Sequence, residues 1–237
     1  MSASGTAIEL GVGSHVLFTD RQHGNLSSAG GEGAEGGPRA RERLRELTGV
    51  RVLSRGYQVH GTRVERVIRR PAPERAGAPP READGQATAL AGVGAMVLSA
   101  DCLPVALASE GAVTMLHAGW RGLAAGVLEQ GIEALRELDS GPASRDSSRS
   151  GQIVAVVGPG AGACCYEVGP EVHAAFAGAH AHGRRIDLRA IAHERLEAAG
   201  VAVVGDVAAC TICDERFFSH RREGARAGRQ AGVAWLS

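Results

Sequence analysis

The chain contains no lysine, so all 26 basic residues other than histidine are arginines. A Walker-type phosphate loop needs its lysine and Schiff-base catalysis needs a side-chain amine, so the sequence excludes both. Any phosphate that the protein binds must be held by arginine, by backbone amides or by a metal ion.

An excess of charge and long apolar runs are also absent. The basic and acidic residues, 26 of each, cancel to a formal net charge of zero, which argues against an electrostatic surface for nucleic acid. No apolar run reaches the roughly eighteen residues of a membrane span. We therefore expect neither nucleic acid nor a membrane as a partner.

Aromatic residues make up only 3% of the chain, although 44% of its residues are hydrophobic. The core must therefore be built mainly from valine, leucine, isoleucine and alanine. Residues 1–10 lack the basic start and apolar centre of a secretion signal, and the five cysteines are an odd number. Both observations predict reduced thiols and a cytoplasmic location.

A length of 237 residues fits one large domain, and we expect a single domain over 1–237. Segments rich in Gly, Ser, Pro or Arg are expected to be surface loops or disordered; they are 27–37, 71–82 and 140–151. Apolar residues at helical spacing predict helices over 38–47, 122–138 and 187–199. Short apolar runs predict strands over 64–68, 93–99, 112–117, 153–157, 201–204 and 233–236. These patterns indicate a mixture of α and β structure.

Three short segments together supply two imidazoles and one thiolate. They are Gln58-Val59-His60-Gly61, Ala100-Asp101-Cys102-Leu103-Pro104 and His117-Ala118-Gly119-Trp120-Arg121-Gly122. His60, Cys102 and His117 match the donors of a catalytic zinc site, which takes three protein ligands and leaves a fourth position open. Copper could occupy the same site. Taken singly, each of the three is as readily an ordinary core or loop residue.

Two residues beside these ligands are candidates for catalysis. Arg121 lies next to the predicted start of a helix, where free amides favour anions, so we expect it to contact phosphate or substrate. The alternative is a surface ion pair. Asp101 could orient a ligand histidine or act as a general acid or base, and the alternative is an aspartate that forms a turn or caps a helix.

The other four cysteines do not suggest a second site. Cys164 and Cys165 are adjacent, and we interpret them as structural. Cys210 and Cys213 have CxxC spacing, but no second CxxC and no nearby histidine pair completes a tetrahedral metal site. We therefore expect neither metal binding nor redox chemistry there.

Arginines gather near the C-terminus in a segment that also contains glycine. Arg221 is the candidate catalytic residue of this group, which also includes Arg222, Arg226 and Arg229. Such a cluster can clamp phosphate bidentately, and the alternative is a solvated loop.

The chain resembles the laccase-domain family, also called multicopper polyphenol oxidoreductase-like proteins. The resemblance rests on the three segments above, on Phe18-Thr19-Asp20-Arg21, on GPGAGACCYEVG over 158–169, and on FFSHRR over 217–222 followed by Gly228-Arg229. It covers nearly the whole chain, although His220 stands where the family commonly has tyrosine. It implies an α+β fold in which mixed β-sheets pack together and are flanked by helices, and it supports a functional role for Arg221 or Arg222.

The better-supported activity of this family is that of a purine nucleoside phosphorylase. The resemblance therefore implies a zinc-dependent enzyme that cleaves adenosine, inosine or methylthioadenosine with phosphate. Its products would be the free base and ribose 1-phosphate or methylthioribose 1-phosphate, with accompanying adenosine deaminase activity. The expected partners are a purine nucleoside and phosphate, and the expected state is a monomer.

Two other functions stay open, namely copper-dependent phenol oxidation and metal-dependent hydrolysis that edits cell-wall precursors. A laccase-type copper cluster uses many imidazoles in several HxH pairs, whereas this chain has nine histidines and one such pair, His180 and His182. The HxE and PCxxC signature of zinc-dependent cytidine deaminases is absent as well. A metal-activated water could still deaminate adenosine or hydrolyse a precursor, so the residues alone do not separate these reactions.

Overall fold

The computed structural model of the chain describes residues 7–11, 13–71, 81–139 and 151–237. Most of the two loops predicted over 71–82 and 140–151, and the first six residues of the chain, lie outside these ranges. The third predicted loop, 27–37, is irregular until a short 3-10 helix, η2 (Ala34–Gly36). Gly31 in this segment packs directly against the backbone of Ala227, near the end of the chain.

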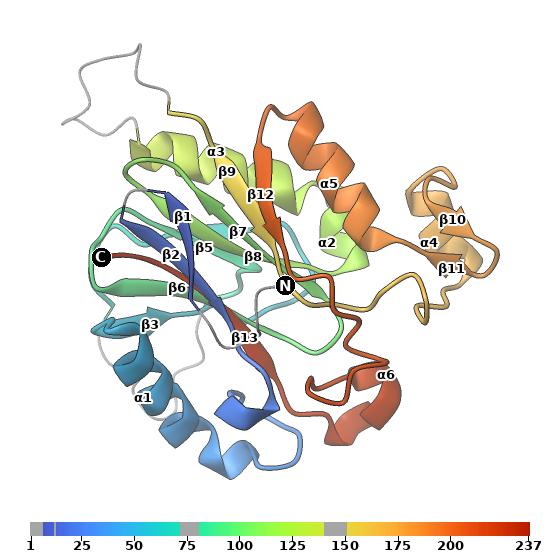
Figure 1. The fold of residues 1–237 in the computed structure, drawn as a ribbon, viewed down its shortest axis with the longest axis horizontal. Coiled ribbons are helices and arrows are strands. Elements are labelled where there is room, and N and C mark those ends of the chain that lie inside the picture. Colours follow the sequence, from blue (N-terminus) through green and yellow to red (C-terminus); the bar gives the residue numbers. More distant parts are fainter. Residues whose placement is uncertain (1–6, 12, 72–80, 140–150) are drawn as a thin grey trace.

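Two mixed β-sheets form the centre of the protein (Figure 1). The five-stranded sheet has the order β1 (Ile8–Gly11), β2 (Ser14–Phe18), β13 (Gln230–Leu236), β6 (Val93–Ser99) and β3 (Val52–Ser54). The six-stranded sheet has the order β12 (Ala202–Asp206), β9 (Val154–Val157), β7 (Leu103–Ala108), β8 (Val113–Ala118), β5 (Gly85–Thr88) and β4 (Val64–Arg66). Its outer pairs are parallel and its inner pairs antiparallel. A separate hairpin joins β10 (Ala181–His182) to β11 (Arg185–Ile186).

Helices cover the outer faces of the two sheets, so the molecule has four layers (Figure 1). Helix α1 (Gly37–Thr48) packs on the five-stranded sheet, whereas α2 (Trp120–Ala125), α3 (Val127–Asp139) and α5 (Leu188–Ala198) pack on the six-stranded sheet. Because successive side chains of a strand point to opposite faces of its sheet, one strand contributes to two separate parts of the core. In β6, Ala95 and Val97 face the other sheet, and Met96 faces α1. The predicted fold of packed mixed sheets flanked by helices is confirmed.

Small side chains allow the two sheets to approach closely, in keeping with the low aromatic content. A Cβ atom added at Gly232 in β13 would lie 2.8 Å from Met115 Sδ and 3.0 Å from Pro104 Cβ of the other sheet. The layer between the sheets consists largely of alanine and valine. The close approach matters for function, because β7 and β8 carry two of the predicted metal ligands at or beside their ends.

The prediction of one continuous helix over 122–138 is wrong. The chain forms α2 and α3, which are separated at Gly126 with a left-handed φ of 99°. The amide of Gly126 closes α2 by donating to Gly122 and Leu123. Apolar spacing continues through the break, so periodicity alone does not reveal it.

The other two predicted helices agree with the structure to within one residue at each end. Helix α1 stops before Gly49, which has a φ of 71°. At the start of α5, Asp187 Oδ1 accepts a hydrogen bond from Ala190 N at 3.0 Å, so the predicted N-cap is present. Shorter helices not predicted from the sequence are η1 (Arg21–His23), α4 (Pro170–Ala175), α6 (His220–Glu223) and η3 (Gly224–Arg226).

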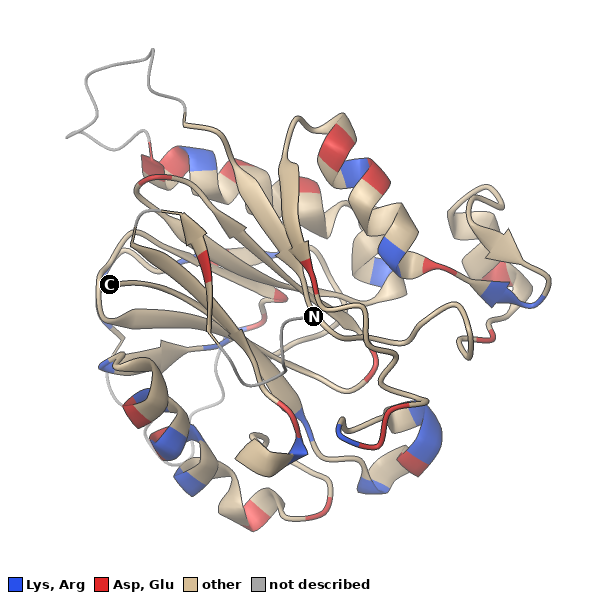
Figure 2. Ribbon diagram, viewed as in Figure 1, with Lys and Arg blue, Asp and Glu red and all other residues tan. Residues whose placement is uncertain are grey.

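The helices carry interleaved arginine and acidic residues rather than a face of one sign (Figure 2). This arrangement agrees with the zero net charge. Among the described residues, no helix combines the length and apolar character that crossing a bilayer requires.

Candidate metal centre and pocket

A sharp turn presents His60 and is held by one buried carboxylate. Asp84 accepts hydrogen bonds from the backbone N–H groups of Val59, His60 and Gly61 at 3.0, 2.9 and 2.8 Å. His60 has a φ of 61°, in the left-handed region that is costly for a residue with a side chain. The three hydrogen bonds offset this strain, so Asp84 fixes the position from which His60 projects.

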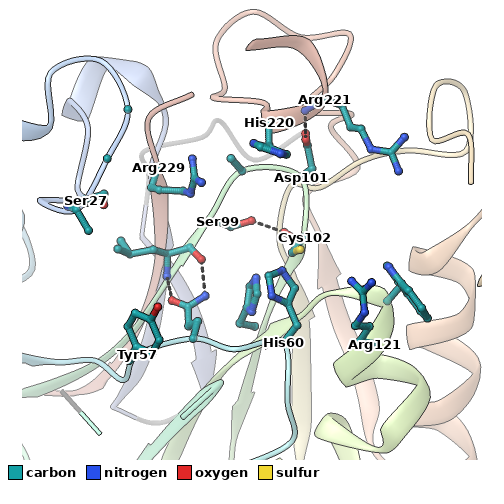
Figure 3. Close-up of a pocket in the computed structure, with 18 of the residues that line it drawn as sticks. Ser27, Tyr57, His60, Ser99, Asp101, Cys102, Arg121, His220, Arg221 and Arg229 are labelled. Atoms are coloured by element: carbon teal, nitrogen blue, oxygen red, sulfur yellow. Dashed lines mark hydrogen bonds between the residues drawn. The ribbon is translucent and has the colours of Figure 1, made fainter. Parts of the chain in front are cut away.

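The turn is also fastened to the five-stranded sheet through Gln58. The Gln58 side-chain amide donates to the carbonyl of Leu98 at 2.7 Å, and its oxygen accepts from Leu98 N at 2.8 Å. These paired bonds, drawn as dashed lines in Figure 3, imitate one step of a β-ladder. The glutamine of the QVHG motif therefore positions the histidine two residues later.

His117 is oriented by the same carboxylate that holds the turn. Its Nδ1 lies 2.8 Å from Asp84 Oδ1, and His117 and Asp84 are 4% and 0% exposed. This contact leaves Nε2 as the free ring nitrogen. The sequence analysis considered Asp101 for orienting a ligand histidine; that interpretation is wrong, because Asp84 occupies the position.

Cys102 reaches the two histidines from the neighbouring strand. It immediately precedes β7, whose antiparallel pairing with β8 places Pro104 opposite His117. The hydroxyl of Ser99 donates to the Cys102 carbonyl, and Asp101, just before it, has a φ of 90°. Close packing also constrains the HAG motif, since a Cβ atom at Gly119 would lie 2.9 Å from both Cys102 Sγ and His60 Cδ2.

The three predicted ligands therefore converge. One donor atom from each of His60, Cys102 and His117 lies within 4.8 Å of the others, and the two imidazole centroids are 4.9 Å apart. A pair of imidazole nitrogens and a thiolate sulfur suits zinc or copper. The donor set and its convergence thus fit a bound metal ion.

The electrostatics of the cluster favour the thiolate that a metal requires. Burial raises the pKa of the Cys102 thiol, but the charge of His117 and hydrogen bonds from His117 and His60 outweigh burial and lower it to about 6. Burial lowers the pKa of His117, yet the Cys102 thiolate and the hydrogen bond to Asp84 raise it to about 9. Near neutral pH, Cys102 is therefore a thiolate, the form that binds metal.

A pocket of about 620 Å³ opens above this cluster, and His60, Cys102 and His117 all line it. The three candidate catalytic residues Asp101, Arg121 and Arg221 line it as well. Figure 3 shows the arginines around the pocket and His60 and Cys102 close together at its base. Its other lining residues include Arg55, Tyr57, Trp120, Tyr166, Leu188, His220 and Arg229. The cavity is large enough for a small organic ligand.

Asp101 joins three parts of the pocket wall. Its Oδ1 accepts from the Thr211 hydroxyl at 2.7 Å, and its Oδ2 accepts from the backbone N–H of Arg221 at 2.7 Å. Asp101 therefore anchors the segment that carries the C-terminal arginines to the segment that carries Cys102. Each carboxylate oxygen retains a further lone pair for another partner.

Arg121 and Arg221 reach the pocket from two different segments of the chain. Arg121 lies in the first turn of α2, rather than ahead of it as predicted, and its guanidinium stacks 4.4 Å from the Trp120 ring centroid. Within the described part of the chain, Arg121 has no carboxylate partner. The guanidinium of Arg221 lies 4.8 Å from the Tyr166 ring centroid, and its Nη1 donates to the Glu167 carbonyl at 2.8 Å. Arg121 is thus the better placed of the two to receive an anion.

Arg222 has a different part in the same segment. It donates to the carbonyls of Thr211, Ile212 and Phe217 at 2.7, 2.9 and 2.5 Å. These bonds use its guanidinium to hold neighbouring loops together. Arg222 is therefore a structural residue rather than a phosphate clamp.

The remaining four cysteines come together, which their sequence spacing does not predict. Their sulfur atoms form a second group within 4.8 Å of one another; the members are Cys164, Cys165, Cys210 and Cys213. The sulfurs that join the CxxC pair lie more than forty residues away in the sequence. The described residues therefore contain two groups of side chains that could hold a metal ion.

Comparisons with known proteins agree with this architecture. A family model described as multi-copper polyphenol oxidoreductase laccase matches residues 11–237. A purine nucleoside phosphorylase of Xylella fastidiosa is 39% identical over 95% of this chain and 89% of its own length. One of Streptomyces coelicolor is 35% identical over 94% and 96% of the two chains.

Solved structures show the same fold. A Neisseria meningitidis protein superposes with a TM-score of 0.79 at 31% identity, over 99% of this chain and 100% of its own. The protein YlmD from Geobacillus stearothermophilus gives a TM-score of 0.73 at 24% identity, over 94% and 92%. Since the family model spans nearly the whole sequence and the relatives align along most of their length, the chain belongs to the multi-copper polyphenol oxidoreductase laccase family.

Proposed function

We propose that this protein is a zinc-dependent purine nucleoside phosphorylase. The observation that carries the proposal is the open three-donor cluster at the base of an arginine-lined pocket of about 620 Å³. The name shared by its relatives supports the same reaction. His60, Cys102 and His117 would hold the zinc, which when bound supplies positive charge and Lewis acidity.

The side chains around the pocket have complementary tasks in phosphorolysis. Arg121 binds phosphate, and Arg221, which also lines the pocket, adds a second positive charge. A phosphate oxygen forms a bond to C1′ of the ribose while the bond from C1′ to the purine nitrogen breaks. The departing purine keeps the electron pair and takes up one proton. Asp101 is the acidic residue among those that line the pocket, so we assign it this proton transfer.

The preferred nucleosides follow from the same proposal. We expect adenosine, inosine and methylthioadenosine to be cleaved, and adenosine also to be deaminated, with water replacing its amino group at C6. The protein would act as a cytoplasmic monomer on nucleoside and phosphate. Trp120 and Tyr166 offer aromatic surfaces on which a purine could stack.

The laccase-like alternative has less support. A multicopper cluster needs several groups of imidazoles, but within the described ranges only His60 and His117 share a metal-competent cluster. A single copper ion could still occupy that cluster. The comparison of zinc-loaded and copper-loaded protein on nucleosides and phenols separates the two functions.

The deciding assay follows adenosine and inosine by chromatography with and without phosphate. Purified zinc-loaded protein should release free base and ribose 1-phosphate only when phosphate is present. Cys102→Ala serves as the control and should be inactive. Base release that does not depend on phosphate would contradict phosphorolysis and favour a hydrolase, including one acting on cell-wall precursors.

A further inference from the structure

Two loops far apart in the sequence are held side by side next to the pocket. Gly160 and Cys210 form an isolated parallel β-bridge, in which Gly160 N donates to Ala209 O at 3.2 Å and Thr211 N donates to Gly160 O at 3.0 Å. The bridge aligns the turn that contains Cys164 and Cys165 with the turn that contains the CxxC pair. Backbone pairing, rather than sequence spacing, therefore brings four thiols together.

The four sulfur atoms form one compact group. All lie within 4.8 Å of one another, with Cys213 Sγ 2.6 Å from Cys165 Sγ and 3.4 Å from Cys164 Sγ. A zinc ion with bonds of about 2.3 Å places its tetrahedral sulfurs about 3.8 Å apart, so small side-chain rotations would accommodate it. A disulfide would employ only two of the four sulfurs.

Polar groups around the cluster suit a bound thiolate complex. Gly162 N–H points at Cys210 Sγ at 3.2 Å, a contact that stabilises a thiolate. Arg185 donates to the Cys164 carbonyl at 2.7 Å, and Arg222 donates to the carbonyls that follow Cys210. A zinc ion with four thiolates carries two net negative charges, and these two guanidinium groups bind the backbone of the loops that carry the cysteines. The surroundings therefore offset the charge that metal binding would leave.

We propose that Cys164, Cys165, Cys210 and Cys213 bind a second zinc ion, in a closed site with a structural role. Four protein ligands complete a tetrahedral zinc and leave no position for substrate. Cys164 and Cys213 are exposed, so metal can enter from solvent. The proposal is independent of the reaction assigned to the pocket, because none of these cysteines lines it.

The site would stiffen one wall of the pocket. Tyr166 directly follows Cys165 and lines the pocket, and Thr211 directly follows Cys210 and donates to Asp101 at 2.7 Å. A metal that joins the two loops would fix both neighbours at once. The second zinc would thus hold together two short, exposed loops that their own packing does not fix.

Elemental analysis of two matched variants tests the proposal. Each variant removes one cysteine sulfur from one of the two clusters. Wild type purified with Zn²⁺ present should contain about two zinc ions per chain, and Cys213→Ser and Cys102→Ala about one each. The double variant should contain almost none. Equal zinc in Cys213→Ser and wild type would overturn the proposal, and so would a Cys102→Ala protein without zinc.

A spectroscopic test keeps the proposal falsifiable if Cys213→Ser does not fold. Cys102→Ala loaded with Co²⁺ retains only the four-cysteine cluster, and should show the intense thiolate-to-cobalt absorption of a tetrahedral tetrathiolate site. Titration of free thiols under non-reducing conditions accompanies it. Absence of that absorption, or loss of two free thiols to a disulfide in the untreated protein, would overturn the second zinc site.

Discussion

The two cysteine-containing clusters of this protein differ in how many ligands they offer and in what lies above them. His60, Cys102 and His117 provide three donors at the base of a pocket. The other cluster provides four sulfurs between two surface loops, and none of its cysteines lines that pocket. The two clusters therefore differ in ligand number and in access to the pocket. Three ligands that face a cavity leave a coordination position for a reactant, whereas four protein ligands complete the coordination of the metal.

The supports of the two clusters differ as well. In the three-donor cluster Cys102 and His117 lie at strand ends and His60 in a turn, and one fully buried carboxylate, Asp84, contacts the ring of His117 and the backbone around His60. The four-cysteine cluster depends on backbone amides and exposed arginines. A catalytic centre needs its ligands preorganised before substrate arrives, whereas a structural metal can itself order the loops that bind it.

Among changes outside the metal ligands, the largest effect should come from Arg121, which lines the same pocket as the three-donor cluster. Arg121→Ala should lower kcat/KM for phosphate about 10²-fold while zinc content and melting temperature stay unchanged, because it removes a charge-assisted contact. Arg45→Ala is the matched control, since Arg45 pairs with Glu42 on the surface of α1. Unchanged phosphate kinetics in Arg121→Ala would instead favour Arg221 as the phosphate ligand.

A second expected effect concerns Asp84, the carboxylate that supports the three-donor cluster. Asp84→Asn should weaken zinc binding at the three-donor cluster about 10–100-fold, because the amide loses the charge that orients His117 and places a donor against backbone N–H groups. Chelator competition measures the affinity, and zinc on the four cysteines should not change. Asp206→Asn, which alters a carboxylate paired with Arg189 and His193, is the control. If Asp84→Asn and wild type bind zinc equally, Asp84 does not support the metal.

The smallest expected effect is the pH dependence of Cys102 alkylation in the metal-free protein. The pKa of Cys102 is lowered from 9.0 to about 6, so the thiolate prevails above about pH 6. Alkylation of Cys102 by iodoacetamide, followed by mass spectrometry of its peptide, should therefore accelerate as pH rises through 6 and then level off. Zinc should protect the residue. A midpoint near pH 9 would show that His117 and His60 do not stabilise the thiolate.

Apolar patterns predict a mixture of α and β structure, the family resemblance implies the packed sheets, and the three short motifs together predict that His60, Cys102 and His117 share one site. The sequence does not predict Asp84, whose partners lie 23 to 33 positions away and are chosen by tertiary packing. Nor does it predict β5, a buried strand of the residues GQAT with little β-propensity.

The four-cysteine cluster was missed for a related reason. Cys164 and Cys210 are brought together by the β-bridge between Gly160 and Cys210, and backbone pairing of this kind leaves no periodic signal. The adjacent pair and the CxxC pair were therefore interpreted separately. The usable signal is the presence of two cysteine pairs in one chain, whatever the number of residues between them.

We infer that chemistry belongs to the open cluster and structural support to the closed one. The most direct test measures phosphate-dependent cleavage of adenosine or inosine by Cys102→Ala and Cys213→Ser side by side. We predict that Cys102→Ala loses about 10³-fold or more in kcat/KM and that Cys213→Ser stays within about tenfold of wild type. An active Cys102→Ala protein, or a Cys213→Ser protein that is folded yet inactive, would contradict the claim.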